Sequence, residues 1–175
     1  MRWAFAYLGQ TKPHPMRKDS PGVYLPPPLI YVACFFIGLG LQKLLPLPPG
    51  PGPGTGPTML AVCCFVLAAV LVPPALLRFL RTRNTLVTAL PARSLQTGGI
   101  YAFSRNPMYA GLLLVYCGLA LLVGNWWTLL LVPVLVTVVQ RVVILPEERY
   151  LQRAFGADYT AYKARVRRWI GPRGA

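Results

Sequence analysis

The chain has 175 residues, of which 55% are hydrophobic and only 13% are charged. With a mean hydropathy of +0.49, this composition is too apolar for a water-soluble domain of this size and is typical of an integral membrane protein. The net charge is +14, from 18 Lys and Arg against four Asp and Glu. Because the basic residues flank apolar runs, and do not alternate with aromatic residues on one face, they indicate contact with a membrane surface and argue against nucleic-acid binding.

Residues 1–28 form a polar, Pro-rich lead without a small-residue cleavage site, so no signal peptide is predicted. Two apolar runs follow at residues 29–45 and 58–77. A helix that crosses a bilayer needs roughly 17–25 such residues, so both runs are predicted membrane spans. Between them, residues 46–57 (PLPPGPGPGTGP) are an uncharged turn region. The first two spans therefore occupy residues 29–77.

Two further apolar runs, residues 108–123 and 126–145, predict a third and a fourth span, the third slightly short. Gly124 and Asn125 between them predict a tight hairpin. Clusters of Lys and Arg occur in the lead, in the link between the second and third spans, and in the tail. By the positive-inside rule, both termini and this link are predicted to be cytoplasmic. The expected fold is a single all-α, polytopic membrane domain over residues 1–175.

Metal and disulfide chemistry are not expected. The four cysteines lie within the predicted spans and form no CxxC pattern, which favours a role in packing. His14 is the only histidine and lies between two prolines in the lead. A zinc site of His and Cys residues is therefore not predicted.

The stretch SRNPMYAG, residues 104–111, predicts the start of the third span. Asn106 and Pro107 suit the N-cap and the first position of a helix. A helix start also leaves backbone N–H groups available for an anion, and the Arg105 guanidinium beside it suits a carboxylate. The structural alternatives are a plain helix cap and an arginine that extends to the lipid headgroups.

Glu147 and Glu148 stand side by side where the fourth apolar run ends, and they are half of the acidic residues in the chain. No Lys or Arg lies three or four residues from either one, so no local helical ion pair is available. Adjacent carboxylates at a membrane boundary need a compensating cation, either an arginine of the middle link or a bound ligand. In the alternative interpretation, Pro146 begins a helix and the pair favours its N-terminal dipole.

The tail is predicted to form amphipathic helices. Tyr150, Leu151 and Phe155 lie on one helical face, Gly156 interrupts it, and Asp158 can cap a second helix of alternating aromatic and basic residues. Such a segment lies on the anionic cytoplasmic leaflet. It either covers a site between the third and fourth spans or serves only as a membrane anchor.

Three segments, in this order and spacing, carry a family resemblance: Gly99-Ile100-Tyr101, then SRNPMYAG, and, after the predicted hairpin, EERYLQRAFGADYTAYKARVRRW. Together they resemble the integral-membrane methyltransferases of the isoprenylcysteine carboxyl methyltransferase and phospholipid methyltransferase superfamily. The resemblance covers residues 97–169, which are the expected cofactor-binding and catalytic half. The first two spans resemble the family only in topology.

The resemblance implies S-adenosylmethionine as methyl donor and a lipophilic acceptor that arrives from the bilayer. It implies that Glu147 and Glu148 hold the ammonium group of the donor, one of them also orienting or deprotonating the acceptor. Arg105 would bind a carboxylate of the donor or the acceptor, so Arg105 and Glu148 are the catalytic candidates. The cofactor-binding candidates are Tyr101, Arg105, Asn106, Pro107, Tyr109, Glu147 and Glu148. The two tyrosines can contact a sulfonium through cation–π interaction or simply belong to the interfacial aromatic belt.

Asn106 departs from the isoprenylcysteine enzymes, which usually have His here, and is similar to the N-P-M-Y of phosphatidylethanolamine N-methyltransferases. Asn does not titrate near neutral pH, so a positioning role is favoured. The acceptor stays open among an isoprenylated cysteine carboxylate, a phospholipid amine and a small hydrophobic thiol. Other classes are a non-catalytic membrane adaptor and a membrane reductase, although the sequence has no phosphate-binding glycine motif on a strand. The oligomeric state is not predicted.

Overall fold

The computed structural model describes residues 25–51, 54–81 and 94–172. Their regular secondary structure is helical, and the only strand-like pairing among them is an isolated bridge between Val166 and Pro172. The predicted all-α class is therefore confirmed for the described part of the chain. The basic lead, the middle of the basic link and the last three residues lie outside it, together with the predictions made for them.

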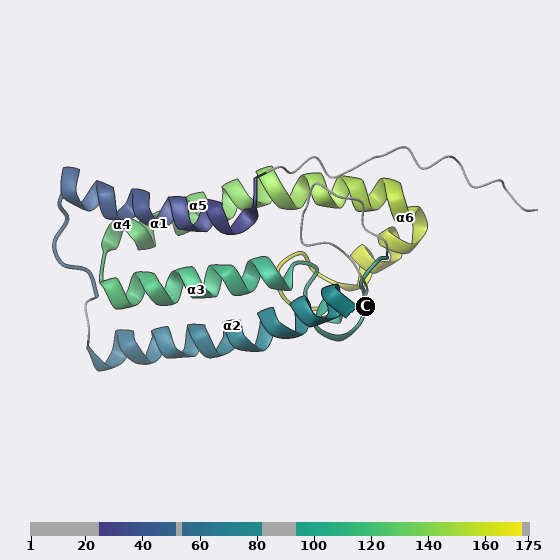
Figure 1. The fold of residues 1–175 in the computed structure, drawn as a ribbon, viewed down its shortest axis with the longest axis horizontal. Coiled ribbons are helices and arrows are strands. Elements are labelled where there is room, and N and C mark those ends of the chain that lie inside the picture. Colours follow the sequence, from purple (N-terminus) through teal and green to yellow (C-terminus); the bar gives the residue numbers. More distant parts are fainter. Residues whose placement is uncertain (1–24, 52–53, 82–93, 173–175) are drawn as a thin grey trace, which may run out of the picture.

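One helix stands at the centre of the fold. The helices in chain order are α1 (Pro27–Leu44), α2 (Thr55–Arg81), the 3-10 helix η1 (Gly99–Ala102), α3 (Pro107–Val123), α4 (Trp126–Leu130), α5 (Val132–Val139), the π-helix η2 (Gln140–Ile144) and α6 (Leu145–Arg165). Figure 1 shows α3 between α2 on one side and α1 with α5 on the other. Side chains of α3 can therefore contact helices on both of its sides.

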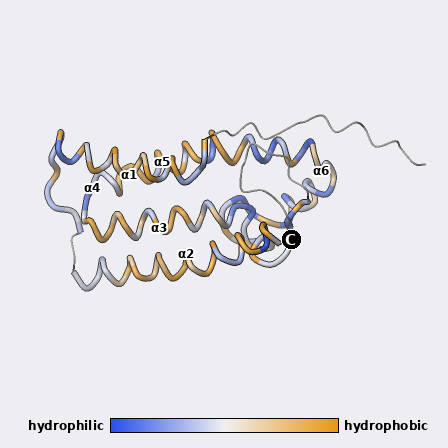
Figure 2. Tube along the Cα trace, viewed as in Figure 1, coloured by the Kyte–Doolittle hydropathy of each residue, from blue (hydrophilic) through white to orange (hydrophobic). Residues whose placement is uncertain are grey.

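Within residues 25–51, 54–81 and 94–172, three helical segments are long and apolar enough to cross a membrane, namely Pro27–Leu44, Thr55–Arg78 and a part of Trp126–Arg165. Figure 2 shows apolar residues along α2 and α3 and hydrophilic residues in α6. These features indicate a membrane protein. The apolar helix α3 has 17 residues, a length of about 25 Å, against roughly 30 Å for the hydrocarbon core of a bilayer. A fourth span in α3 stays a prediction.

The long helix that follows α3 contains a π-helical turn just before the acidic pair. The N–H of Leu145 donates to the carbonyl of Gln140, five residues earlier. A regular helix would bring the ring of Pro146 against the carbonyl four residues before it, and the wider turn relieves that contact. The backbone stays helical at Ile144. This continuity argues against the alternative in which the acidic pair faces the dipole of a newly begun helix.

A second irregularity turns α6 back toward the bundle. Gly156 has φ 49° and ψ −115°, a non-helical conformation inside α6. Its carbonyl accepts hydrogen bonds from Gln152 Nε2 at 3.0 Å and Thr160 Oγ1 at 3.1 Å. The predicted interruption at Gly156 is therefore present. It lets the last part of α6 place Tyr159 and Tyr162 against the start of α3.

Two glycines of α3 allow close contact with α2. A Cβ atom added to Gly118 would lie 2.8 Å from the Phe65 ring, and one added to Gly111 would overlap the Val72 side chain. Because small residues let helices in a membrane approach closely, both positions require glycine. The glycine that ends SRNPMYAG therefore has a packing role.

At the opposite end of α3, the predicted hairpin is present. Gly124 adopts the left-handed conformation (φ 62°, ψ 41°) that commonly ends a helix. Asn125 then caps α4, because its Oδ1 accepts from the backbone N–H groups of Trp127 at 2.8 Å and Thr128 at 3.3 Å. The Gly50 N–H donates to the Gly124 carbonyl at 3.0 Å and joins the two turns of this end.

Candidate functional site

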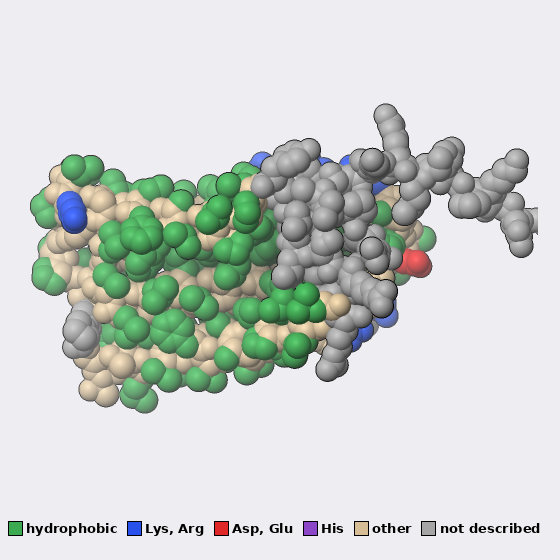
Figure 3. All heavy atoms as spheres, viewed as in Figure 1, with side chains coloured by type: hydrophobic (Ala, Val, Ile, Leu, Met, Phe, Trp, Pro, Cys, Tyr) green, Lys and Arg blue, Asp and Glu red, His purple; other side chains and the backbone are tan. Residues whose placement is uncertain are grey.

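Polar side chains gather at one end of the bundle, which we call the polar end and define as η1, the first turn of α3, α6 and the segment after it. Figure 3 shows hydrophobic side chains along the length of the bundle and most of the visible charged side chains at the end where α6 lies. The other end, the turn end, is defined by residues 45–51, 54–55 and 123–126. In the described part of the chain, the ionisable side chains that contact one another across elements are therefore concentrated at the polar end.

Arg105 is the most deeply buried cation of this end. Its side chain is 5% exposed, and its Nη1 lies 3.2 Å from Glu148 Oε1. The same nitrogen donates to the Tyr159 hydroxyl at 3.5 Å. A cation buried to this extent needs a compensating negative charge. Arg105 therefore points into the protein, and the alternative of an arginine extended to lipid headgroups is wrong.

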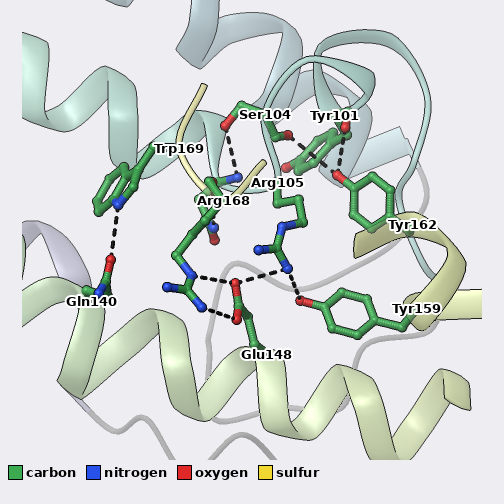
Figure 4. A network of polar contacts seen from close by, with 10 residues as sticks. Tyr101, Ser104, Arg105, Gln140, Glu148, Tyr159, Tyr162, Arg168 and Trp169 are labelled. Atoms are coloured by element: carbon green, nitrogen blue, oxygen red, sulfur yellow. Dashed lines mark hydrogen bonds and ion pairs between the residues drawn. The ribbon is translucent and has the colours of Figure 1, made fainter. Parts of the chain in front are cut away.

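Glu148 binds a second arginine that the sequence did not single out. Arg168 Nε donates to Glu148 Oε1 at 2.9 Å and its Nη2 donates to Oε2 at 2.8 Å (Figure 4). The Glu148 side chain is 14% exposed and that of Arg168 30%. Such two-pronged geometry is the strongest form of this ion pair. The hydrogen bonds to Glu148 raise the pKa of the Arg168 guanidinium and outweigh the opposite effect of its partial burial.

Asn106 occupies the N-cap position of α3 but does not cap the helix. Its side chain accepts no hydrogen bond from the first turn. Instead, its Nδ2 donates to the Arg168 carbonyl at 3.0 Å. The backbone N–H of Asn106 donates to the Ser104 hydroxyl at 3.1 Å. The predicted capping hydrogen bond is therefore wrong, because the Asn106 side-chain amide is oriented toward the Arg168 carbonyl of the segment after α6. Pro107 does begin α3, as predicted.

Glu147 has different surroundings from Glu148. Its Oε1 accepts a hydrogen bond from the Tyr109 hydroxyl at 2.8 Å. The Tyr109 carbonyl accepts one from the Tyr31 hydroxyl at 3.0 Å, which connects α1 to the site. Among the described residues, Glu147 forms no ion pair with a Lys or Arg side chain. The two neighbouring acids therefore differ in their charge balance.

Tyr101 forms an aromatic wall of the site together with the returning part of α6. The Tyr162 hydroxyl donates to the Tyr101 carbonyl at 2.6 Å. The Tyr101 side chain is buried, and burial, followed by the negative charge of nearby Glu147, raises the pKa of its phenol, whereas Arg78 lowers it. The phenol is therefore protonated and able to donate a hydrogen bond.

The cofactor that the family resemblance implies can be tested against two buried atoms. The Tyr101 hydroxyl and Arg105 Nε have no hydrogen-bond partner in the described part of the chain. Buried polar atoms are normally satisfied, so each such atom calls for an explanation. Both belong to residues that lie beside the acidic pair. Two donors and a carboxylate without an ion pair suit a ligand that carries a carboxylate and an ammonium group, so the residues present fit an amino-acid moiety.

Next to this network, an open depression of about 380 Å³ lies between the two parts of α6. This volume falls at the lower end of the range for ligand pockets, roughly 300–1,000 Å³. Its lining residues are Leu145, Glu148, Arg149, Gln152, Arg153 and Lys163. Most of the charged side chains in this lining are therefore basic.

The structure brings most of the predicted site residues together. One contact joins Arg105 to Glu148, and another joins Tyr109 to Glu147. Tyr101 lies near Glu147. Sequence reasoning missed several contributors, because they looked like membrane-surface residues or lay in the first span. They are Tyr31, Ser104, Gln140, Tyr159, Arg168 and Trp169. For Tyr159, Arg168 and Trp169, the alternation of basic and aromatic residues in the tail was the available signal.

Comparisons with known proteins agree with the resemblance. Residues 57–158, more than half of the chain, match the family described as phospholipid methyltransferase. A protein from Haemophilus influenzae, described as an uncharacterized protein, is 40% identical over 63 residues, which are 36% of this chain and all of that protein. No solved structure matches the chain. The family match contains the whole of α3 and both glutamates but ends before Tyr159 and Arg168. The family implies a membrane methyltransferase, and the chain belongs to the phospholipid methyltransferase family.

Proposed function

We propose that this protein transfers a methyl group from S-adenosylmethionine to a lipophilic acceptor at the polar end of the bundle. The observation that carries the proposal is the buried set of opposite charges at the start of α3, beside two buried donors without partners. Family membership supports methyl transfer. The site residues support a donor with an amino-acid moiety.

Each residue has a role that follows from its contacts. The acidic pair supplies the negative charge for the ammonium group, and the Tyr109 hydroxyl orients Glu147. Arg105 and the Tyr101 hydroxyl donate to a carboxylate, because both have a buried donor atom to spare. Pro107 starts α3 at this point, and Asn106 holds the chain after α6 in place. Arg105 and Glu148 stay the catalytic candidates, with Glu148 stabilising Arg105.

When bound, S-adenosylmethionine supplies an electrophilic methyl group on a sulfonium. The protein has to hold an acceptor lone pair in line with that carbon and to exclude water, and such positioning lowers a barrier by several kcal/mol. Tyr101 and Tyr162 are buried and close the site on the α6 side. No proton transfer by Asn106 is needed, in agreement with its hydrogen bond to a carbonyl.

The acceptor is proposed to be a lipid that approaches from the bilayer. The outward faces of α1 and α2 are apolar, as Figure 3 illustrates for one side of the molecule. The family favours a phospholipid amine, and an isoprenylated cysteine carboxylate fits the same route. A small hydrophobic thiol is the alternative. Incubation of the purified protein with labelled donor and each acceptor class, followed by extraction of labelled lipid, distinguishes them.

We propose further that α1, α2, α3 and the α5 part of the long helix all cross the membrane, with the polar end and both termini in the cytoplasm. Exposed Thr55 at the turn end and exposed Asp158 at the polar end allow a test. In a cysteine-free background, a membrane-impermeant maleimide should label Thr55→Cys in intact cells and Asp158→Cys only after permeabilisation. The reverse pattern would overturn this orientation.

Donor binding is the decisive test of the function. Calorimetric titration of S-adenosylmethionine and S-adenosylhomocysteine into the detergent-purified protein should give saturable binding, lost in Glu147→Gln and in Arg105→Ala. Asp158→Asn and Lys43→Ala are matched controls, because both side chains are exposed away from the network. The absence of binding in detergent and in lipid nanodiscs would instead favour a non-catalytic membrane adaptor, and binding of a reduced dinucleotide would favour a reductase.

A further inference from the structure

Residues 166–172, which follow α6, cross the start of α3, and we call this segment the C-terminal strap. The Arg105 N–H donates to the Arg167 carbonyl at 3.2 Å, and the Gly171 N–H donates to the Phe103 carbonyl at 2.8 Å. The strap folds on itself through the Arg167 N–H, which donates to the Gly171 carbonyl at 3.0 Å. The backbone of the strap is therefore paired with the chain that leads into α3.

Side chains attach the strap to three other elements (Figure 4). Arg168 binds Glu148 of α6. The indole of Trp169 donates to Gln140 Oε1 in the π-helix at 3.1 Å. Asn106 at the start of α3 donates to the Arg168 carbonyl. Of these contacts, only the one between Arg168 and Glu148 joins opposite charges, so it is expected to be the strongest.

The two acids of the pair differ in the number of cations that lie next to them. Glu148 already faces two guanidinium groups, those of Arg105 and Arg168, and the three side chains together carry a net charge of +1. An additional ammonium group at Glu148 would meet two like charges at short range. Glu147 faces the Tyr109 hydroxyl and no cation in the described part of the chain. Burial raises the pKa of the Glu147 carboxyl to about 7, although the hydrogen bond from Tyr109 lowers it. A ligand ammonium group placed there would favour the ionised carboxylate and would meet no cation of the described chain at short range.

We propose that Arg168 is a positioning residue that holds the strap over the site through Glu148, and that Glu147 is the member of the pair that contacts the donor's ammonium group. The role of Glu147 rests on the proposed function, because it assumes S-adenosylmethionine as the ligand. The role of Arg168 in holding the strap does not depend on the ligand. Glu148 acts on the donor indirectly: it keeps Arg105 in place, and it keeps the strap closed over the polar end.

Hydrogen exchange tests the structural part without any ligand. In detergent or nanodiscs, the backbone amides of residues 166–171 should exchange on the order of tenfold faster in Arg168→Gln and Glu148→Gln than in the wild type, because both variants remove the two-pronged ion pair; tenfold corresponds to about 1.4 kcal/mol. Exchange in α3 should be unchanged, which excludes general unfolding. Arg165→Gln is the matched control, since Arg165 is an exposed cation at the end of α6, directly before the strap. Equal strap protection in all variants would overturn the role of Arg168.

Donor binding tests the assignment of the two acids. With S-adenosylhomocysteine as probe, Glu147→Gln should lose binding while the strap stays protected. Arg168→Gln should weaken binding about tenfold or more. Arg168→Lys, which keeps a cation beside Glu148 and leaves the pair of Glu148 with Arg105 untouched, should retain most of the affinity. A Glu147→Gln variant that binds the probe as tightly as the wild type would overturn the assignment of Glu147.

Two more outcomes separate this inference from the proposed function. A wild-type protein whose strap depends on Arg168, but which binds no donor, would refute the methyltransferase assignment and leave the strap contact standing. If Arg168→Gln loosens the strap and leaves donor affinity unchanged, Arg168 positions nothing in the site, and that part of the proposal is overturned.

Discussion

The bundle and the polar end are held together in different ways. Between α2 and α3, contact depends on shape, because Gly111 and Gly118 accept Val72 and Phe65 in the space where a side chain would stand. At the polar end, contact depends on named donors and acceptors, and Glu148 alone accepts from Arg168 twice and pairs with Arg105. Side-chain volume therefore governs contact in the bundle, and the identity of the polar atoms governs it at the polar end.

The difference follows from the surroundings of each region. Lipid chains are as apolar as the side chains of the bundle, so helices there associate by close packing and not by the hydrophobic effect. The polar end contains charges that have lost most of their water, so each requires a partner in fixed geometry. Substitutions that change one atom type should therefore act mainly at the polar end, and substitutions that change volume mainly in the bundle.

The largest effect is expected for Glu148→Ala. It leaves Arg105, whose side chain is 5% exposed, without its counter-ion, and the loss of one partner of such a buried pair costs about 3–5 kcal/mol. The free energy of unfolding in mixed micelles should fall by an amount of that order. Because Arg168 is more exposed than Arg105, Arg168→Ala should cost clearly less, and an equal loss in both variants would contradict this account.

Gly111→Ala should have the next largest effect, because its methyl group would overlap Val72. Overpacking of this kind costs about 1–3 kcal/mol of stability. The matched control is Gly40→Ala in α1, where an added Cβ meets nothing within 4 Å. Thermal unfolding of the two variants should differ. If both melt alike, α2 and α3 do not pack as closely as described.

Tyr109→Phe should affect ligand binding more than stability. It removes the hydrogen bond to Glu147 but leaves the aromatic ring in place. A hydrogen bond to a charged group contributes about 1.5–3 kcal/mol, so donor affinity should fall by roughly one order of magnitude or somewhat more. Calorimetry measures this change. Tyr31→Phe is the comparison, because its hydroxyl bonds only the Tyr109 carbonyl, and it should retain most of the affinity.

The smallest effect is expected on the outward face of α2. Val66 is exposed there, and its replacement by Leu should change stability by less than about 0.5 kcal/mol. The same volume change at Val72, which packs against Gly111, should be measurable in the same unfolding experiment. A large effect at Val66 would reveal a helix or second molecule on this face.

Composition and apolar run length were enough to predict the helical class, the positions of the main helices and the turn at Gly124. These features depend on neighbouring residues and on the length of chain that a bilayer requires. The residues that carry ionisable chemistry were also visible, because a charge in so apolar a chain is rare and costly. Their partners were not visible, since Arg168 lies 20 positions from Glu148 and Tyr159 lies 54 from Arg105.

Only the tertiary structure decided which of the two adjacent glutamates is paired. The bends at the π-helix and at Gly156 return the end of the chain to the start of α3, and Arg168 arrives at Glu148 as a result. The same return path explains why Asn106 holds a carbonyl of the strap and does not cap its helix. Sequence determined where charges lie along the chain. The path of the backbone determined which charges meet, because ion pairs and hydrogen bonds act only over a few ångströms.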